Sequence, residues 1–135
     1  MPAPGPNAAE PKPRRVLVVD DDTKLVDVIV RSLVRAGYEC DVARSGDQAL
    51  WKVTNHNPDA LVLDVMIPHP SGVEVCRHLR DRGFTGAVVV VSARSRPDDR
   101  AAATRAGADA FLAKPFPLYD LIATLASLFT KPATA

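Results

Sequence analysis

Five short apolar runs alternate along the chain with stretches in which apolar residues recur at helical spacing. The first, third and fourth runs show no alternation with polar residues, as in strands that are buried on both faces of a sheet. In the second run Glu39 and Asp41 point to one face, which suits a strand at the edge of the sheet. The runs are Arg15–Asp20, Tyr38–Ala43, Ala60–Asp64, Ala87–Ser92 and Ala110–Ala113.

An amphipathic stretch of helical period follows each run, and each begins at a helix-starting residue. These residues are Asp22 or Thr23, Ser45, Ser71, Pro97 and Pro117. Gly37 and Gly83 end the first and third stretches, and the fourth reaches about Ala106. A strand followed by a helix five times predicts an α/β fold of the (βα)5 type, with a doubly wound parallel sheet and right-handed crossovers.

The chain has 135 residues, of which 47% are hydrophobic, so we expect one domain with a single core over residues 14–130. Closely spaced prolines predict a disordered, Pro-rich tail over 1–13, and a second flexible tail is expected over 131–135. Cys40 and Cys76 lack the spacing of metal ligands, so both are expected to be reduced and half-buried.

The formal net charge of +1 argues against nucleic acid as a direct partner. No apolar run approaches the roughly 18 residues that a membrane span needs, and the N-terminus lacks the apolar stretch of a signal peptide. We therefore expect a cytoplasmic protein that does not contact a membrane.

Polar side chains that can bind a cation or a phosphoryl group stand at the ends of four runs. They are Asp20, Asp21 and Asp22 after the first run, Asp64 after the third, Ser92 after the fourth and Lys114 after the fifth. Because ligands in open parallel sheets sit at the carboxyl ends of the strands, these side chains are expected to lie together. Crowded carboxylates need protons or a cation, and hard oxygen ligands suit Mg²⁺. Asp22 is the exception, since a helix cap is the favoured role there.

A carboxylate in such a site can act as a nucleophile towards phosphorus and form an aspartyl phosphate. This chemistry depends on positioning and charge neutralisation, which Mg²⁺ and Lys114 would supply.

The sequence resembles the receiver domain of bacterial response regulators from about Arg14 to Phe129. The matching stretches are VLVVDDD, LVLDVMIPHPSG, VVVVSAR, AGADAF and KPF, in the order and spacing of the family. The resemblance implies a flavodoxin-like fold with strand order 2-1-3-4-5. It also implies a phosphoacceptor of two-component signalling that is phosphorylated by a sensor histidine kinase, a phosphotransfer protein or a small phosphodonor.

The resemblance implies the roles of the acidic residues. Asp64 corresponds to the phosphorylated group. Asp21 would ligate Mg²⁺ directly, together with Asp64 and the backbone carbonyl of Met66, while Asp20 would act through water.

The resemblance also implies a switch. Ser92 and Lys114 would contact the phosphoryl group, and the bond from Lys114 to Pro115 is typically cis in the family. Phe111 stands at the aromatic position whose rotamer follows Ser92. Phosphorylation would draw Ser92 in, turn Phe111 inward and change the face made by the fourth helix, the fifth strand and the fifth helix.

The chain departs from the family pattern in the loop after Asp64, where it reads His69-Pro70-Ser71-Gly72. Two nearby prolines should stiffen this loop, and His69 is expected to be an exposed loop residue. Met66 and Arg94 stand at positions that tune the lifetime of the phosphoryl group in the family. A bulky methionine with an arginine predicts a long-lived phosphoaspartate.

The segments AGADAF and LIATLASLF lack the ADDY motif and the arginines of winged-helix regulators with this receiver type. We therefore expect a chemotaxis-regulator-like, stand-alone, monomeric response regulator that acts through an unknown downstream protein. We expect no enzyme activity beyond phosphotransfer to Asp64 and slow autodephosphorylation.

Two alternatives remain open. The chain could be the receiver part of a DNA-binding transcriptional regulator whose output domain is absent. A remote alternative is an aspartate-nucleophile phosphatase, since Asp20 and Asp22 have the DxD spacing, although Lys24 stands where that motif needs threonine.

Overall fold

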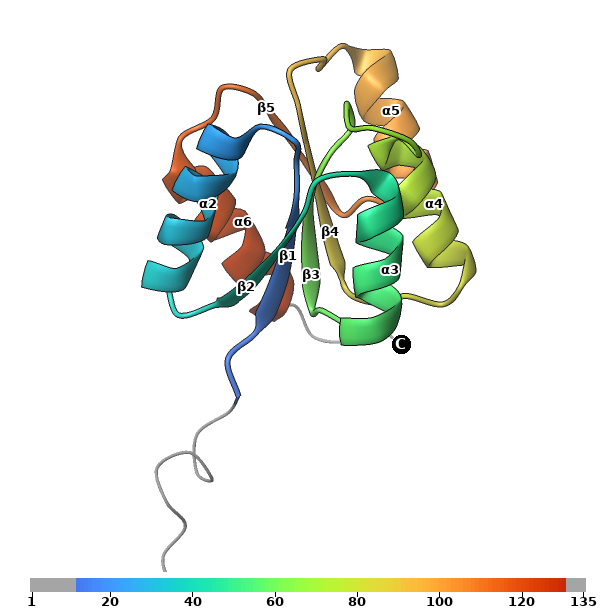
Figure 1. The fold of residues 1–135 in the computed structure, drawn as a ribbon. Coiled ribbons are helices and arrows are strands. Elements are labelled where there is room, and N and C mark those ends of the chain that lie inside the picture. Colours follow the sequence, from blue (N-terminus) through green and yellow to red (C-terminus); the bar gives the residue numbers. More distant parts are fainter. Residues whose placement is uncertain (1–11, 131–135) are drawn as a thin grey trace, which may run out of the picture.

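The structure is a computed structural model that describes residues 12–130, which form a five-stranded parallel sheet between two layers of helices (Figure 1). The strand order is β2-β1-β3-β4-β5, and every strand pairs in parallel with its neighbour. The predicted fold class and strand order are confirmed. The strands are β1 (Arg15–Val19), β2 (Glu39–Ala43), β3 (Ala60–Asp64), β4 (Ala87–Ser92) and β5 (Ala110–Ala113). The helices are α2 (Thr23–Arg35), α3 (Gly46–His56), α4 (Gly72–Asp81), α5 (Pro97–Ala106) and α6 (Leu118–Thr130).

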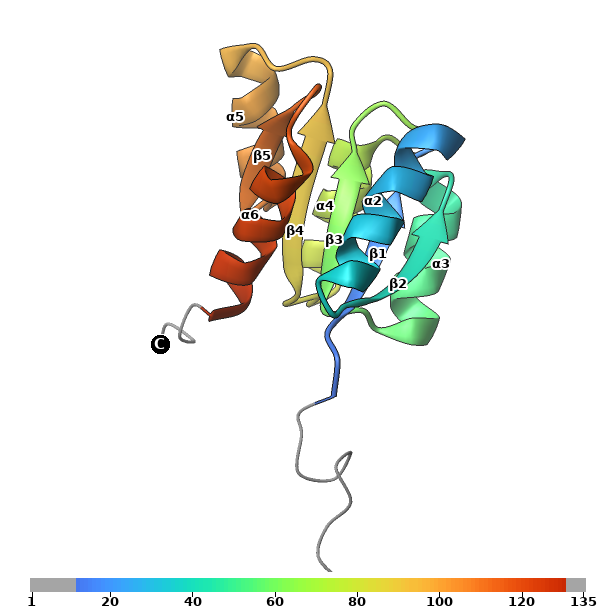
Figure 2. The same ribbon diagram turned by 90° about the vertical axis from the view of Figure 1, so that its left-hand side faces the viewer.

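Helices α2 and α6 cover one face of the sheet, and α3, α4 and α5 cover the other (Figures 1 and 2). Alternate residues of β1 enter the two layers of the core. Val16 and Val18 pack with residues of α2 and α6, whereas Leu17 and Val19 pack with residues of α3 and α4. Because a central strand buries both faces, its sequence shows no polar alternation.

The element boundaries differ from the predicted ones by single residues, and hydrogen bonds explain the differences. Asp20 lies just beyond β1, yet its N–H still donates to the Ala43 carbonyl at 3.0 Å. Tyr38 precedes β2 because its N–H donates to the Leu33 carbonyl and so closes the end of α2.

The predicted helix caps are confirmed. Asp22, Ser45 and Ser71 each accept a hydrogen bond from the N–H three residues further on, at 3.2, 3.2 and 3.3 Å. Gly37 has a φ of 101°, a conformation that favours glycine after the end of α2. Asp22 is therefore a cap, as expected.

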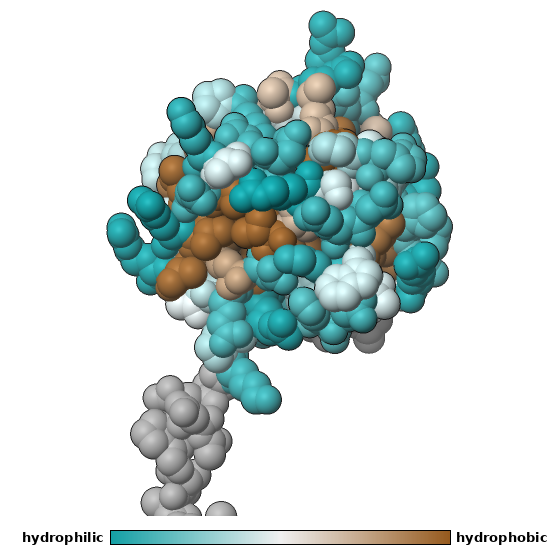
Figure 3. All heavy atoms as spheres, in the orientation of Figure 1, coloured by the Kyte–Doolittle hydropathy of each residue, from teal (hydrophilic) through white to brown (hydrophobic). Residues whose placement is uncertain are grey.

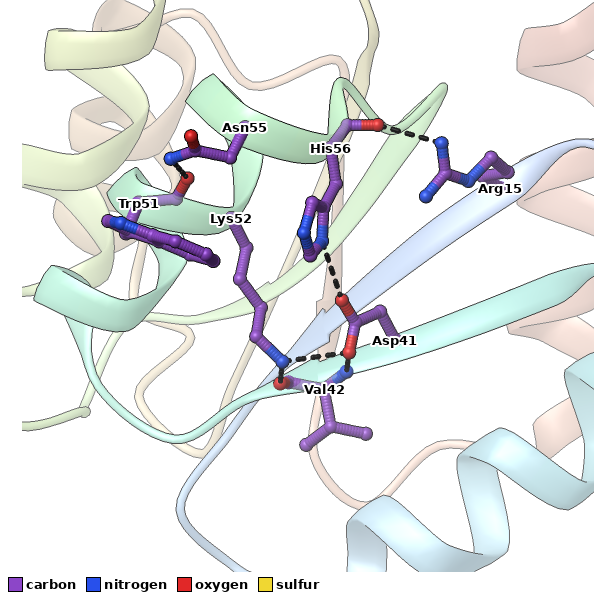
Figure 4. Close-up of polar contacts among 7 residues, drawn as sticks. All are labelled: Arg15, Asp41, Val42, Trp51, Lys52, Asn55 and His56. Atoms are coloured by element: carbon purple, nitrogen blue, oxygen red, sulfur yellow. Dashed lines mark hydrogen bonds and ion pairs between the residues drawn. The ribbon is translucent and has the colours of Figure 1, made fainter.

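The backbone N–H and the carbonyl of Val42, at the free edge of β2, are both held by side chains (Figure 4). The Val42 N–H donates to Asp41 Oδ1 at 2.8 Å, and Lys52 Nζ donates to the Val42 carbonyl at 2.6 Å. Lys52 Nζ also lies 2.8 Å from Asp41 Oδ1, and His56 Nδ1 lies 3.3 Å from Asp41 Oδ2. These side chains occupy groups that an unpaired edge would otherwise offer to a strand of another molecule.

Both cysteines are free, Cys76 being buried and Cys40 half-buried. Burial raises the pKa of the Cys40 thiol to about 11, so this thiol is a weak nucleophile at neutral pH. No helix within residues 12–130 is long and apolar enough to cross a membrane. The predicted tails lie outside the described residues, apart from Lys12 and Pro13, and stay predictions.

Candidate functional site

The carboxyl ends of β1, β3, β4 and β5 meet at the upper edge of the sheet in Figure 1. Asp20 follows β1, Asp64 and Ser92 are the last residues of β3 and β4, and Lys114 follows β5. Asp20, Asp64 and Ser92 are almost fully buried, with exposed fractions of 1%, 5% and 0%. Such burial of polar side chains is uncommon unless they are paired. These three side chains are therefore expected to form hydrogen bonds or ion pairs within the site.

Lys114 is the partner of both buried carboxylates. Its Nζ donates to Asp20 Oδ2 at 2.9 Å and to Asp64 Oδ2 at 3.0 Å. These contacts join the end of β5 to the ends of β1 and β3, which are separated by 94 and 50 residues in sequence. The predicted proximity of Asp64, Asp20 and Lys114 is confirmed.

Asp20 and Asp64 share the single ammonium group of Lys114, and this excess of negative charge affects the pKa values of Asp64 and Lys114. Burial, helped by the charge of Asp20, raises the pKa of Asp64 above its ordinary value, although the Met66 N–H and Lys114 oppose the rise. Burial by itself would lower the pKa of Lys114, but its hydrogen bonds to Asp20 and Asp64 raise it. The excess of negative charge favours the protonated forms of Asp64 and Lys114. It also favours the binding of a cation to the carboxylates.

Asp21 completes an acidic cluster with these two residues. Asp20, Asp21 and Asp64 each offer a carboxylate oxygen, and the three oxygens lie within 4.8 Å of one another. Asp21 is exposed, whereas Asp20 already accepts hydrogen bonds from the Asp22 N–H at 3.0 Å and from Lys114. Three ionised carboxylates and one ammonium carry a charge of about −2, which suits a divalent cation with oxygen ligands. The donor set therefore fits Mg²⁺.

Met66 lies beside the cluster, and its N–H donates to Asp64 Oδ1 at 3.0 Å. Ligation of Mg²⁺ by its carbonyl stays a prediction. Its side chain is 56% exposed, and the side chain of Arg94 is also exposed. Their effect on the lifetime of a phosphoryl group stays a prediction too.

The predicted switch residues lie on β4 and β5. Ser92 Oγ accepts a hydrogen bond from the Arg94 N–H at 3.0 Å, and the Ser92 carbonyl accepts one from the Lys114 N–H at 2.8 Å. Phe111 is partly buried against the core under α3, α4 and α5. The bond from Lys114 to Pro115 is cis, as the resemblance implied. The bond from His69 to Pro70 is also cis, which was not predicted.

Two glycines that support the loop after β3 were missed at the level of the sequence. The Gly72 N–H donates to the Val65 carbonyl at 3.0 Å, and a Cβ atom at Gly72 would overlap the Asp64 carbonyl. The Gly46 N–H donates to the Pro68 carbonyl at 2.9 Å, and a Cβ atom there would overlap the Pro70 carbonyl. The available signal was a Ser-Gly pair at the start of both α3 and α4.

The chain matches the response regulator receiver domain over residues 16–126 and belongs to that family. It is 45% identical over 123 residues to the response regulator MprA of Mycobacterium tuberculosis strain H37Rv, covering 90% of this chain and 54% of that protein. The chain thus spans about half the length of the curated relatives it matches.

Two solved structures show the same fold. A putative response regulator from Chloroflexus aurantiacus superimposes with a TM-score of 0.84 at 32% identity, covering 89% of this chain and all of that one. The chemotaxis response regulator CheY4 of Vibrio cholerae superimposes with a TM-score of 0.80 at 27% identity, covering 86% and 98%. The prediction that the chain is a receiver domain of two-component signalling is confirmed.

Proposed function

We propose that Asp64 accepts a phosphoryl group from a histidine kinase, a phosphotransfer protein or a small phosphodonor, in the presence of Mg²⁺. The observation that carries the proposal is the position of the Asp64 carboxylate. Its Oδ2 lies 3.0 Å from Lys114 Nζ, its Oδ1 is held by the Met66 N–H, and oxygens of Asp20 and Asp21 lie beside it. The group is thus positioned, charged and supplied with cation ligands.

In the transfer step a carboxylate oxygen of Asp64 forms a bond to phosphorus. The bond from phosphorus to the donor breaks, and its electron pair leaves with the donor. Asp21 and Asp64 would hold Mg²⁺, which would supply positive charge beside the transferred phosphoryl group. Lys114 already lies against Asp64 and supplies the second positive charge.

Phosphorylation then changes the charge beside Lys114 and Ser92. A carboxylate charge is replaced by a phosphoryl group that carries roughly −1.5 to −2 units at neutral pH. Ser92 is expected to move towards the phosphoryl group and to donate a hydrogen bond from its hydroxyl to a phosphoryl oxygen. Phe111, on the neighbouring strand β5, is expected to turn inward with it. A complete change from 1:99 to 99:1 in the population of the activated state needs a differential stabilisation of about 5.5 kcal/mol.

The phosphodonor protein is proposed to dock beside the site, in a groove between α2 and the loop before α6. This groove has a volume of about 540 Å³ and is lined mainly by apolar side chains, and Lys114 is also among its lining residues. Leu25 and Val28 come from α2, and Phe116 and Leu118 from the other side. Figure 3 shows apolar surface over α2, where Val28 is 46% exposed. A helix seated here would bring its phosphorylated residue to Asp64.

We propose that the activated molecule is a monomer that binds a downstream protein through the surface of α5, β5 and α6. The second candidate is the receiver part of a longer DNA-binding regulator, and the half-length match to the MprA proteins favours it. The second candidate predicts dimerisation through the same surface on activation. Light scattering with and without beryllofluoride, a phosphoryl mimic, distinguishes the two.

The test of the proposed function is the site and lifetime of phosphorylation. Incubation with acetyl phosphate and Mg²⁺ should add one phosphoryl group, which peptide mapping should place on Asp64. Asp64→Asn should take up none, whereas the exposed control Asp27→Asn should behave as the wild type. EDTA should prevent the reaction.

Two other results would contradict parts of the proposed function. Label on Asp20 would support the phosphatase alternative and overturn the proposal. After removal of the donor, the phosphoryl group should persist for minutes. Loss within seconds would contradict the long lifetime proposed from Met66 and Arg94 while leaving the acceptor unchanged.

A further inference from the structure

The guanidinium group of Arg100 lies over the ring of Phe111, the aromatic residue of the proposed switch. The central carbon of the guanidinium is 4.7 Å from the centre of the ring. A cation within about 6 Å of an aromatic face is attracted by the electrons of the ring. Arg100 is exposed and Phe111 is partly buried, so the guanidinium covers the ring from the solvent side.

The same side chain also contacts the loop between β4 and α5. Arg100 Nε donates to the Ser95 carbonyl at 3.2 Å. In the same loop the Arg94 N–H donates to Ser92 Oγ at 3.0 Å. One side chain therefore connects the loop that holds Ser92 with the ring of Phe111.

We propose that Arg100 is a positioning residue of the switch, which holds Phe111 in its present position and so sets how many molecules are activated before phosphorylation. This inference rests on the proposed function, to which it adds a third residue beside Ser92 and Phe111. No contact between Arg100 and the phosphoryl group is proposed. Arg100 acts on the equilibrium between the two arrangements of the ring.

The direction of the effect follows from the geometry. An inward turn of Phe111 would take the ring away from the exposed guanidinium, so the contact is expected to stabilise the arrangement that the structure shows. Ser95, whose carbonyl accepts a hydrogen bond from Arg100, lies in the loop that follows Ser92, so a movement of Ser92 towards Asp64 would also act on this contact. A cation–π contact at an exposed position changes such an equilibrium by about two- to fivefold. An arginine that merely covers the surface would leave the equilibrium unchanged.

The test compares Arg100→Met, which keeps an unbranched apolar stem but removes the charged guanidinium group, with Arg100→Lys, which keeps a cation. The matched control is Arg105→Met, an exposed arginine in the last turn of the same helix. Amide resonances of Ala110 and Leu112, the neighbours of Phe111 on β5, report the state of the switch. The two end states are wild-type protein in EDTA and wild-type protein saturated with Mg²⁺ and beryllofluoride.

In EDTA, the resonances of Arg100→Met should shift towards the activated position, corresponding to a two- to fivefold larger activated population. Its half-saturating beryllofluoride concentration should fall, because the activated state then costs less free energy to populate. Arg100→Lys should stay close to the wild type, and Arg105→Met should match it. Thermal unfolding of each variant should change little, since Arg100 is exposed.

The inference is overturned if the wild type responds to beryllofluoride but Arg100→Met does not differ from it. That result would be the same amide resonances in EDTA and the same half-saturating beryllofluoride concentration in both proteins. The inference is also overturned if Arg105→Met shifts as much as Arg100→Met. A wild type that does not respond to beryllofluoride at all would instead contradict the proposed function, and this inference with it.

Discussion

Lys114 is the residue on which the charge balance of the site depends. Its single ammonium group lies 2.9 Å from Asp20 Oδ2 and 3.0 Å from Asp64 Oδ2, and both carboxylates are buried. The lysine therefore does two things that oppose each other. It repels a divalent cation from the carboxylates, and it attracts the anionic group that Asp64 is proposed to accept.

The substitution Lys114→Met should separate these two effects. Removal of one positive charge beside three carboxylates should strengthen Mg²⁺ binding by roughly tenfold, because the repulsion is lost. Binding of beryllofluoride should weaken by at least about tenfold, because a charge-assisted hydrogen bond is lost. Both constants can be measured by titration of amide resonances. The exposed Lys12→Met is the control, and weaker Mg²⁺ binding by Lys114→Met would contradict the argument.

At the scale of single elements, the edge strand β2 depends on the helix that follows it. Asp41 on β2 and Lys52 on α3 together hold the backbone N–H and the carbonyl of Val42 (Figure 4). Burial would raise the pKa of Asp41, but the hydrogen bonds from Lys52, the Val42 N–H and His56 outweigh burial and lower it. The ionised form of Asp41 is therefore the form that stabilises this edge.

The pH dependence of stability should reveal this network. Since the pKa of Asp41 is lower in the folded chain, its contribution is complete above its ordinary value of 3.8 and is lost as the pH falls through the folded value. Lys52→Met should reduce the free energy of unfolding by about 0.5–1 kcal/mol at pH 7, because the pair is partly exposed.

Urea unfolding of Lys52→Met and the wild type should show that this difference shrinks as the pH is lowered to about 3. The exposed Lys24→Met serves as the control. A difference that stays constant down to that pH would show that Asp41 is not involved.

At the scale of the whole molecule, charge is distributed unevenly. The chain as a whole has a formal net charge of +1, whereas the carboxyl edge of the sheet gathers Asp20, Asp21 and Asp64 around one lysine. Folding concentrates this negative charge, and a ligand that binds only the folded chain stabilises it. Fold stability and the state of the site are thus linked.

Mg²⁺ should therefore stabilise the folded chain. At a free concentration of roughly ten times its dissociation constant, the gain in the free energy of unfolding should be about 1.4 kcal/mol. Asp21→Asn should show a smaller gain, and EDTA should abolish it in both proteins. NaCl of equal ionic strength separates binding from screening. An equal effect of NaCl and MgCl₂ on urea unfolding would rule out a specific site.

Much of the candidate site could be predicted because its members stand at strand ends. Asp20, Asp64, Ser92 and Lys114 lie where apolar runs stop, and the carboxyl ends of parallel strands meet at one edge. The helical pattern does not fix which residues of α2 are covered. Leu25 lines the groove beside α6, whereas its neighbour Val26 is buried. The helical period predicts on which face of a helix a side chain lies. Whether that side chain is buried depends on the element that packs against the face.

The sequence by itself determined the (βα)5 pattern, the helix caps and the set of side chains at the site, because these depend on spacing along the chain. Tertiary structure decided that Lys114 lies between Asp20 and Asp64, that Gly46 and Gly72 support the loop after β3, and that Arg100 covers Phe111. Each of these contacts joins elements whose separation in space is set by how the helices and strands pack, and no local pattern encodes that distance.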